Sequence, residues 1–272
     1  MNKRIMLMLI LVVNTVFVSV ASFGQETNKD STTKYSLLIV LTHVDDYVSI
    51  APLIAKYSAE GNKVYFAIFN GVLDSASLEP GGKKREELLC GARALGIQEP
   101  FVTIGPAGEG IAVSAKLANR TIELINQIKP DVIITWGPDG LTGHPRHILV
   151  GNIVTRVFQQ QNLLVHKPRK LYYITYPQNL ILDTINPFGV IANEDGPFGT
   201  VNEKFITTVV DGRNYLKQTH AAIGCHTLPK GELNKKWQAW YERLAITLGG
   251  KVFLRLVFPG TQGKETDIFT GL

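Results

Sequence analysis

Short apolar runs alternate with helical stretches between residues 35 and 177, and this alternation limits the fold more than any other feature. The runs that read as strands are residues 35–42, 63–69, 101–104, 131–136 and 171–175. A run without polar alternation suits a strand that is buried on both faces, as in the interior of a parallel sheet. Helices of ten or more residues between such strands indicate βαβ units. We therefore predict an α/β fold with a mostly parallel sheet, helices on both faces, and a single domain.

Capping and stop residues predict where the helices begin and end. The segment after Ser49 reads as a helix with Ser49 as its N-cap, a proline in the first turn, and Gly61 as its stop. Further helices are expected over residues 83–95, 111–128, 147–160, 214–226 and 235–248, and a late strand over residues 251–258. Residues 178–213 are rich in turn-forming residues, so we expect a long, partly irregular segment that could form one wall of a site.

The first residues have the features of a secretory signal peptide. Lys3 and Arg4 form a basic start, residues 5–20 an apolar core, and the small residues at 19–21 or 22–24 a cleavage site. An uncleaved membrane anchor is the alternative, because the apolar core approaches the length that spans a bilayer. We expect a protein exported to the periplasm or the exterior of a bacterium, with no stable membrane span after cleavage.

The expected organisation is a signal peptide (1–24), a polar leader (25–34) and one domain (35–272), with a core at 35–177 and a less regular part at 178–272. The whole chain has a formal net charge of +5, which becomes +3 when the two basic residues of the signal peptide are removed. No dense stripe of Lys and Arg accompanies this charge, so we expect no nucleic-acid partner. Cys90 and Cys225 can form one disulfide or remain two buried thiols, and the oligomeric state is left open.

Ligand-type side chains follow two of the expected strands. His43 and Asp46 come after the strand at residues 35–42, and the cluster GHPRH at residues 143–147 comes after the strand at 131–136. If these strands are neighbours in a parallel sheet, both turns open at the same edge. Two histidines and one carboxylate with an open position form a catalytic zinc site, and zinc makes hydroxide available near neutral pH. An isolated Asp is more often a cap or turn residue, but two such motifs at strand ends together favour a metal.

These motifs resemble those of the PIG-L/LmbE-like N-acetylglucosaminyl deacetylases, which have a Rossmann-like fold and one divalent metal, usually zinc. The sequence THVDDY at residues 42–47 is similar to the family motif [A/P]-H-P-D-D-E, and residues 130–147 are similar to P-D-x-x-x-T…G-x-x-G-H-P-D-H. Residues 87–96 (ELLCGARALG) resemble E-x3-A-A-x2-L-G, and a fainter likeness returns at residues 217–226. The resemblance runs mainly from residue 36 to 160.

The resemblance implies a role for five residues. His43, Asp46 and His147 match the metal ligands of the family, which bind one Zn²⁺. Asp45 matches the general base that accepts a proton from the attacking water. His144 matches a residue that stabilises the oxyanion or assists the leaving amine.

Four further residues are candidates for substrate binding. Lys84, with Arg85 beside it, stands where the family uses an Arg to hold the substrate. Arg146 either points to solvent or pairs with an anionic group of the substrate. His226 either borders the site or, at a helix end, satisfies nearby carbonyl groups.

Three positions depart from the family motifs. Val44 replaces a proline, and Tyr47 replaces a glutamate that can orient a ligand or contact the sugar. Arg146 replaces the aspartate between the two histidines. A nearby cation disfavours the protonated form of His144, so we predict that activity requires a lower pH than in relatives with aspartate.

The sequence as a whole predicts an exported, metal-dependent hydrolase. By the resemblance, it removes an N-acetyl group from a GlcNAc-containing or related amide substrate, a small molecule or a glycan. Two alternatives remain: a non-catalytic carbohydrate-binding or scaffold relative, and an amidase that acts on a non-sugar amide. The intact set of expected ligands and base favours an enzyme.

Overall fold

The fold is seen in a computed structural model, which describes residues 34–70, 75–105, 111–178, 200–226, 248–259 and 263–272. The strands are β1 (Ser36–Leu41), β2 (Lys63–Asn70), β3 (Phe101–Ile104), β4 (Val132–Trp136), β5 (Lys170–Ile174), β6 (Tyr176–Pro177), β7 (Thr200–Val201), β8 (Thr208–Asp211) and β9 (Lys251–Phe258). The α-helices are α1 (Ala51–Ala59), α2 (Ser75–Leu78), α3 (Lys83–Leu95), α4 (Ile111–Ile128), α5 (Gly140–Gly143), α6 (Pro145–Gln159) and α8 (Leu216–Ile223). The 3-10 helices are η1 (Asp46–Ile50), η3 (Gln161–Leu163), η4 (Glu203–Phe205) and η5 (Arg213–Tyr215).

Seven of these strands form one sheet in the order β3-β2-β1-β4-β5-β9-β8. The five strands from β3 to β5 pair in parallel, whereas β9 pairs antiparallel to both β5 and β8. A mostly parallel α/β sheet is therefore confirmed. The apolar strands explain this arrangement, because the sides of β1 and β4 are buried along nearly their whole length.

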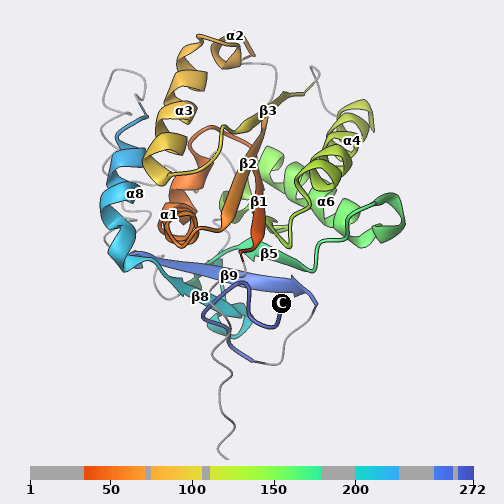
Figure 1. The fold of residues 1–272 in the computed structure, drawn as a ribbon. Coiled ribbons are helices and arrows are strands. Elements are labelled where there is room, and N and C mark those ends of the chain that lie inside the picture. The colour runs from red at the N-terminus through yellow and green to blue at the C-terminus, as the bar shows by residue number, and fades with distance from the viewer. Residues whose placement is uncertain (1–33, 71–74, 106–110, 179–199, 227–247, 260–262) are drawn as a thin grey trace, which may run out of the picture. The chain divides into compact units, whose positions relative to one another are not determined.

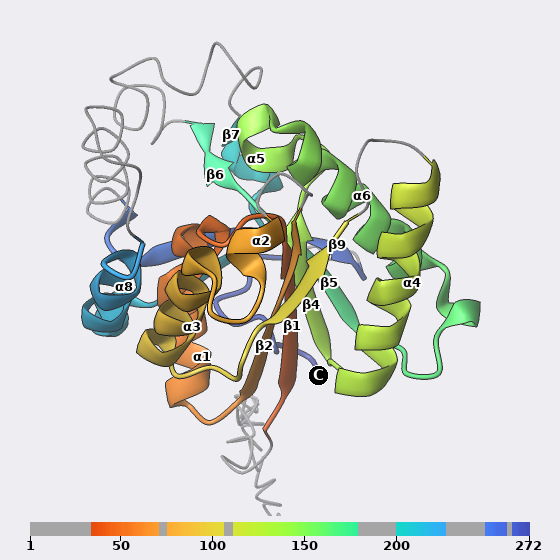
Figure 2. The ribbon, with the colours of Figure 1, turned by 90° about the horizontal axis from the view of Figure 1, so that it is seen from above.

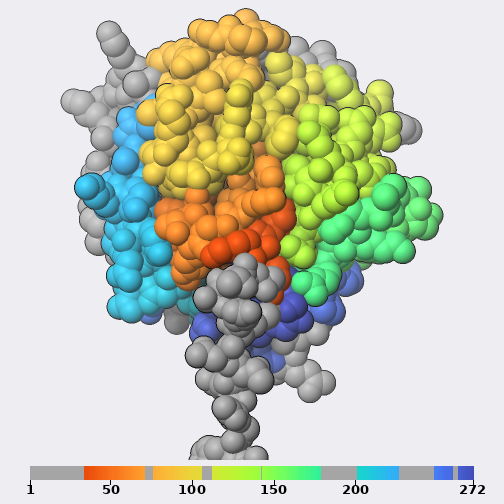
Figure 3. Space-filling view, viewed as in Figure 1, coloured from red at the N-terminus to blue at the C-terminus, as the bar shows by residue number. Residues whose placement is uncertain are grey.

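Helices cover both faces of the sheet (Figures 1 and 2). Helices α1, α3 and α8 pack on one face and contribute to one buried apolar cluster, while α4 and α6 pack on the other face and contribute to a second. In the space-filling view, the orange and yellow residues of the α1–α3 region adjoin the yellow-green residues of α4 (Figure 3). The two clusters hold the strands rigidly, so that their carboxyl ends can serve as a platform for a site.

Most expected elements are present, and the differences lie mainly at helix ends. Ser49 is not the N-cap of α1, because residues 46–50 already form η1 and the Ser49 hydroxyl donates to the Asp46 carbonyl over 2.8 Å. Helix α6 begins at Pro145 rather than at His147. The expected helix at 214–226 is divided into η5 and the shorter α8. Strand β8 lies inside the segment expected to be irregular, and the expected helix at 235–248 falls almost entirely outside the described residues.

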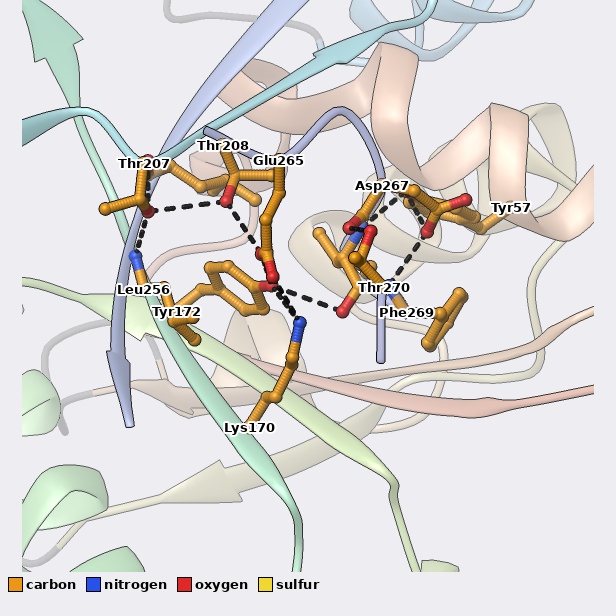
Figure 4. A network of polar contacts seen from close by, with 12 residues as sticks. Tyr57, Lys170, Tyr172, Thr207, Thr208, Leu256, Glu265, Asp267, Phe269 and Thr270 are labelled. Atoms are coloured by element: carbon orange, nitrogen blue, oxygen red, sulfur yellow. Dashed lines mark hydrogen bonds and ion pairs between the residues drawn. The ribbon is translucent and has the colours of Figure 1, made fainter. Parts of the chain in front are cut away.

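The C-terminal segment packs against the amino-terminal ends of the parallel strands, on the side of the sheet away from their carboxyl ends. Lys170, at the start of β5, lies 2.8 Å from the Glu265 carboxylate, which also accepts a 2.6 Å hydrogen bond from the Tyr172 hydroxyl (Figure 4). Tyr57, in α1, donates to the Asp267 carboxylate over 3.2 Å. This polar network fixes the last residues of the chain against the core, because each buried charge is paired.

Cys90 in α3 and Cys225 after α8 form a disulfide with a Cα–Cα distance of 5.7 Å. The bond joins segments that are 135 residues apart in sequence and fastens the end of α8 to the middle of α3. Within the part of the chain that the structure describes, no helix is long and apolar enough to cross a membrane.

Candidate metal centre

The turn that leaves β1 carries the first half of the site. One carboxylate oxygen of Asp46, Oδ2, accepts the backbone N–H groups of Thr42 and His43 over 2.9 and 2.7 Å. These two bonds hold the carboxylate in place and leave its other oxygen, Oδ1, facing the His43 ring, whose Nδ1 lies 3.3 Å away. The tight return of the chain into η1 therefore presents both side chains at the carboxyl end of β1.

The start of α6 carries the second half. His144 is the N-cap residue, and its Nδ1 accepts the backbone N–H of Arg146 over 3.1 Å. His147 lies in the first turn with its ring buried, and its Nδ1 donates to the Gly140 carbonyl over 2.9 Å. The neutral His147 ring therefore keeps its lone pair on Nε2. Gly140 has a positive φ of 63°, and a Cβ there would lie 2.8 Å from Ile148, so this turn requires glycine.

The two halves meet because β1 and β4 are neighbours and parallel. His43 Nδ1 lies 3.1 Å from His147 Nε2, and the Asp46 Oδ1 atom lies 3.3 Å from each of these nitrogens. The structure thus brings together the three residues that the sequence predicts as ligands. His144 is close by: it forms, with the other two histidines, a group whose ligand-type atoms all lie within 4.8 Å of one another.

The spacing and chemistry of this trio fit a divalent metal. Ligands held at about 2.0–2.2 Å in a tetrahedral arrangement lie roughly 3.3–3.6 Å apart, close to the observed 3.1–3.3 Å. The His147 lone pair, a carboxylate oxygen and a second ring nitrogen all converge on one point. The neutral His144 ring, in contrast, accepts at Nδ1 and therefore carries its proton on Nε2, which suits a hydrogen-bond donor better than a ligand.

The pKa shifts show how strongly these groups interact. Burial by itself would raise the pKa of Asp46, but attraction to His147 and His43 holds this pKa well below its usual value. Burial would lower the pKa of His43, yet the Asp46 carboxylate raises it overall, while Arg146 opposes this rise. Asp46 is therefore ionised and ready to bind a cation.

Asp45 lies between the trio and a second group of polar residues. Its carboxylate is near enough to raise the pKa of His43 on one side and those of Tyr47 and His226 on the other. The Asp45 side chain is only partly buried. The role of Asp45 as the base that accepts a proton from water stays a prediction.

Other contacts of the centre escaped the sequence reasoning. The Trp136 indole stacks on the His147 ring, with ring centroids 4.3 Å apart and planes 7° from parallel. Trp136 ends β4 directly before the Gly-rich loop, and this position is the sequence signal for the contact. The stacked indole fixes the His147 ring plane, so that Nε2 keeps its direction.

The candidate substrate-binding residues differ in how close they lie to the candidate metal centre. Lys84 Nζ lies 3.3 Å from the Glu87 carboxylate, which faces His226. Arg85 instead pairs with the exposed Glu99 over 2.8 Å and belongs to the outer side of α3. Arg146 is half-buried beside the centre. A substrate role for each remains a prediction, and Lys84 is better placed for it than Arg85.

Tyr47 turns away from the trio. Its side chain is 1% exposed, and its hydroxyl lies 2.7 Å from His226 Nε2. Val44 is also buried, in the same apolar cluster. The replacements at these two positions therefore change the packing behind the centre and not the set of ligand atoms.

Known proteins resemble this chain in the region of the site. Residues 38–158 match the family model described as "PIG-L: GlcNAc-PI de-N-acetylase". The 1D-myo-inositol 2-acetamido-2-deoxy-alpha-D-glucopyranoside deacetylase of Streptomyces avermitilis is 25% identical over 286 residues, covering 87% of this chain and 97% of the relative. A protein of the same name from Saccharomonospora viridis is 26% identical over 275 residues, covering 87% and 100%.

Two solved structures share the fold. The N,N'-diacetylchitobiose deacetylase from Pyrococcus horikoshii has a TM-score of 0.51 and 16% identity, covering 81% of this chain and 83% of its own. The 4-carboxy-2-hydroxymuconate hydratase from Pseudomonas putida KT2440 has a TM-score of 0.56 and 16% identity, covering 85% and 99%. Their names describe different reactions, so the fold alone does not assign a function.

Proposed function

Because this chain carries a domain of the PIG-L/LmbE-like deacetylase family, we propose that it is a zinc-dependent N-deacetylase that acts on a GlcNAc-containing substrate. The observation that carries the proposal is the convergence of His43, Asp46 and His147, with ligand atoms 3.1–3.3 Å apart. Asp45 and His144 adjoin this trio, which gives the centre a candidate base and a candidate hydrogen-bond donor for the oxyanion. A candidate base and oxyanion donor beside the ligand trio favour an enzyme over the non-catalytic alternative.

His43, Asp46 and His147 would hold the metal. Two nitrogens and one carboxylate oxygen suit zinc and leave a position open for water and substrate. When bound, the ion supplies an activated water and polarises the amide carbonyl.

The remaining chemistry belongs to the two flanking residues. Asp45 accepts a proton from the water as the new C–O bond forms on the acetyl carbon. His144 presents its Nε2–H, because its Nδ1 already accepts the Arg146 amide. This Nε2–H stabilises the developing oxyanion, and the protonated Asp45 passes its proton to the amine nitrogen as the C–N bond breaks. The products are acetate and a free amine.

The substrate class follows from the relatives. The two curated relatives are named as deacetylases of an inositol-linked acetamido sugar, and the matching family model is described as a GlcNAc-PI de-N-acetylase. We infer that an acetamido sugar is the substrate here, with the natural aglycone unassigned. An amidase on a non-sugar amide is the rival that the experiment below separates.

We also propose that the protein is exported. The signal-peptide features of residues 1–24 support this. The disulfide between Cys90 and Cys225 adds support, because such bonds persist mainly in oxidising compartments.

Acetate release tests the proposal directly. The purified protein should bind one zinc ion per chain and release acetate from GlcNAc-inositol or GlcNAc oligomers faster than from simple acetamides. Asp46→Ala should lose both zinc and activity. Asp45→Ala should keep the zinc and lose activity by about 10²–10⁴-fold. A zinc-loaded wild-type protein that releases no acetate from any of these amides contradicts the proposal, and equal rates on sugars and acetamides favour the general amidase.

A further inference from the structure

Three buried polar residues form a group directly behind the candidate metal centre. The Tyr47 hydroxyl lies 2.7 Å from His226 Nε2, and His226 Nδ1 lies 3.9 Å from the Glu87 carboxylate. The side chains of His226 and Glu87 are only 4% and 5% exposed. A substrate contact by His226 would therefore require the imidazole to move out of its pocket.

The chemistry of these three side chains decides which atom donates and which accepts in each contact. A carboxylate can only accept, so the His226 proton is best placed on Nδ1, facing Glu87. His226 Nε2 then accepts from the Tyr47 hydroxyl. Burial lowers the pKa of His226, which keeps the ring neutral and this pattern intact. Tyr47 is in turn the second residue of η1, the turn that begins at Asp46.

The neighbouring helix is shaped to receive the Tyr47 ring. A Cβ at Gly91 of α3 would lie 1.7 Å from the Tyr47 hydroxyl and 2.6 Å from its Cζ atom. Only glycine at this position admits the ring. The family motif has alanine at this place in the helix and glutamate in place of Tyr47.

The disulfide holds His226, the residue that contacts Tyr47. Cys225 precedes His226 directly, and its bond to Cys90 fastens the end of α8 to α3 one residue before Gly91. Helices α3 and α8 lie side by side in both ribbon views (Figures 1 and 2). His226 is thereby anchored to the same helix that receives Tyr47.

We propose that Tyr47 and His226 act as positioning residues, and that their contact fixes the turn carrying the two aspartates of the centre. Tyr47 is one peptide bond away from Asp46, so a shift of its ring moves the carboxylate that faces the histidine trio. Second-layer contacts of this kind typically change metal affinity or activity by about 10–100-fold. The kinetic consequence rests on the proposed deacetylase function, whereas metal binding is measured without turnover.

Four variants test the contact. Tyr47→Phe removes one hydroxyl. His226→Gln can place its amide oxygen where Nε2 stands, whereas His226→Asn reaches only the Nδ1 position and leaves the Tyr47 hydroxyl only the more distant Ala222 carbonyl, at 3.4 Å, as acceptor. Tyr57→Phe is the matched control, because its hydroxyl contacts Asp267 far from the centre. Zinc affinity is measured by chelator competition, kcat and KM by acetate release, and folding by thermal unfolding.

Tyr47→Phe and His226→Asn should each lower zinc affinity and kcat about tenfold, with KM changed less than about twofold. Their double variant should lose no more than either single one, because both remove the same contact. His226→Gln should retain most of the wild-type values. Tyr57→Phe should lower the melting temperature and leave zinc affinity and kcat unchanged.

Wild-type zinc affinity in both Tyr47→Phe and His226→Asn would overturn the positioning role, as would equal losses in His226→Gln and His226→Asn. If the wild-type protein binds zinc but releases no acetate, the proposed function fails, and the zinc affinities of the same variants still decide the positioning role. A wild-type protein that binds no zinc overturns both.

Discussion

Replacing Gly91 by alanine should destabilise the protein, although helix propensity alone predicts the opposite. In a helix interior, Gly→Ala gains about 1 kcal/mol. The added Cβ would lie 1.7 Å from the Tyr47 hydroxyl and 2.6 Å from Cζ, far inside van der Waals contact. Both α3 and the Tyr47 ring are enclosed by core residues, so neither can move freely. Overpacking of this kind costs about 1–3 kcal/mol and sometimes more.

A clash this deep puts the steric cost at about 2–3 kcal/mol, the upper part of that range, and subtracting the gain in propensity leaves a net loss of about 1–2 kcal/mol in the free energy of unfolding. For a domain of this size that loss lowers the melting temperature by roughly 2–8 °C. Urea and thermal unfolding of wild type and Gly91→Ala measure it. Zinc affinity should fall as well, because Tyr47 is pushed away from His226.

The control is the same substitution in a Tyr47→Leu background. Leucine lacks the hydroxyl and Cζ atoms that meet the new methyl group, so Gly91→Ala should stabilise this background by about 1 kcal/mol. The sign of the effect thus reverses with the residue at position 47. A Gly91→Ala variant that stabilises the wild-type background, or that acts equally in both, refutes the packing argument.

Further predictions concern charge, pH and the cross-link. Lys170→Met leaves the Glu265 carboxylate buried without its cation and should lower the free energy of unfolding by about 3–5 kcal/mol; adding Glu265→Gln should recover much of the loss in the same urea titration. Arg146→Asp replaces a cation by an anion beside His144, so the protonated ring, which stabilises an oxyanion more strongly than the neutral ring, should persist to higher pH. The falling alkaline limb of the pH–rate profile for acetate release should therefore move to higher pH, and an unchanged profile would count against an electrostatic role for Arg146. Reduction of the disulfide between α3 and the end of α8 should lower the free energy of unfolding by about 2–5 kcal/mol; a melting temperature that is the same with and without reductant would contradict this.

Sequence patterns predicted the sheet well because burial on both faces leaves a continuous apolar run. The runs at β1 and β4 also predicted the site, since parallel neighbours must open at one edge and the structure pairs these two strands. The direction of β9 could not be predicted, because an apolar run is the same for parallel and antiparallel pairing. Strand β8 was missed because it has four residues within a stretch of turn-forming residues.

Helix starts were less predictable than helix bodies, because a helix can be capped by a residue that is not a usual N-cap. His144 caps α6 with a ring nitrogen, and Pro145 occupies the first helical position. Histidine is not among the favoured N-cap residues, so the pattern pointed to a later start. The same hydrogen bond that defines the cap also selects the tautomer of His144, which sequence spacing cannot reveal.

Two departures from the family motifs, at positions 47 and 91, are in contact with each other in the structure. A tyrosine in place of glutamate after two aspartates reads, in sequence, as the loss of a carboxylate. In the structure, Glu87 lies on the far side of His226, with its carboxylate 3.9 Å from that ring, and Tyr47 contacts the near side. The Glu87 carboxylate, which the family motif also has, therefore still faces the polar group behind the centre, although η1 no longer contributes one. Tyr47 and Gly91 are then one coupled change, since the ring needs the space that a missing side chain provides.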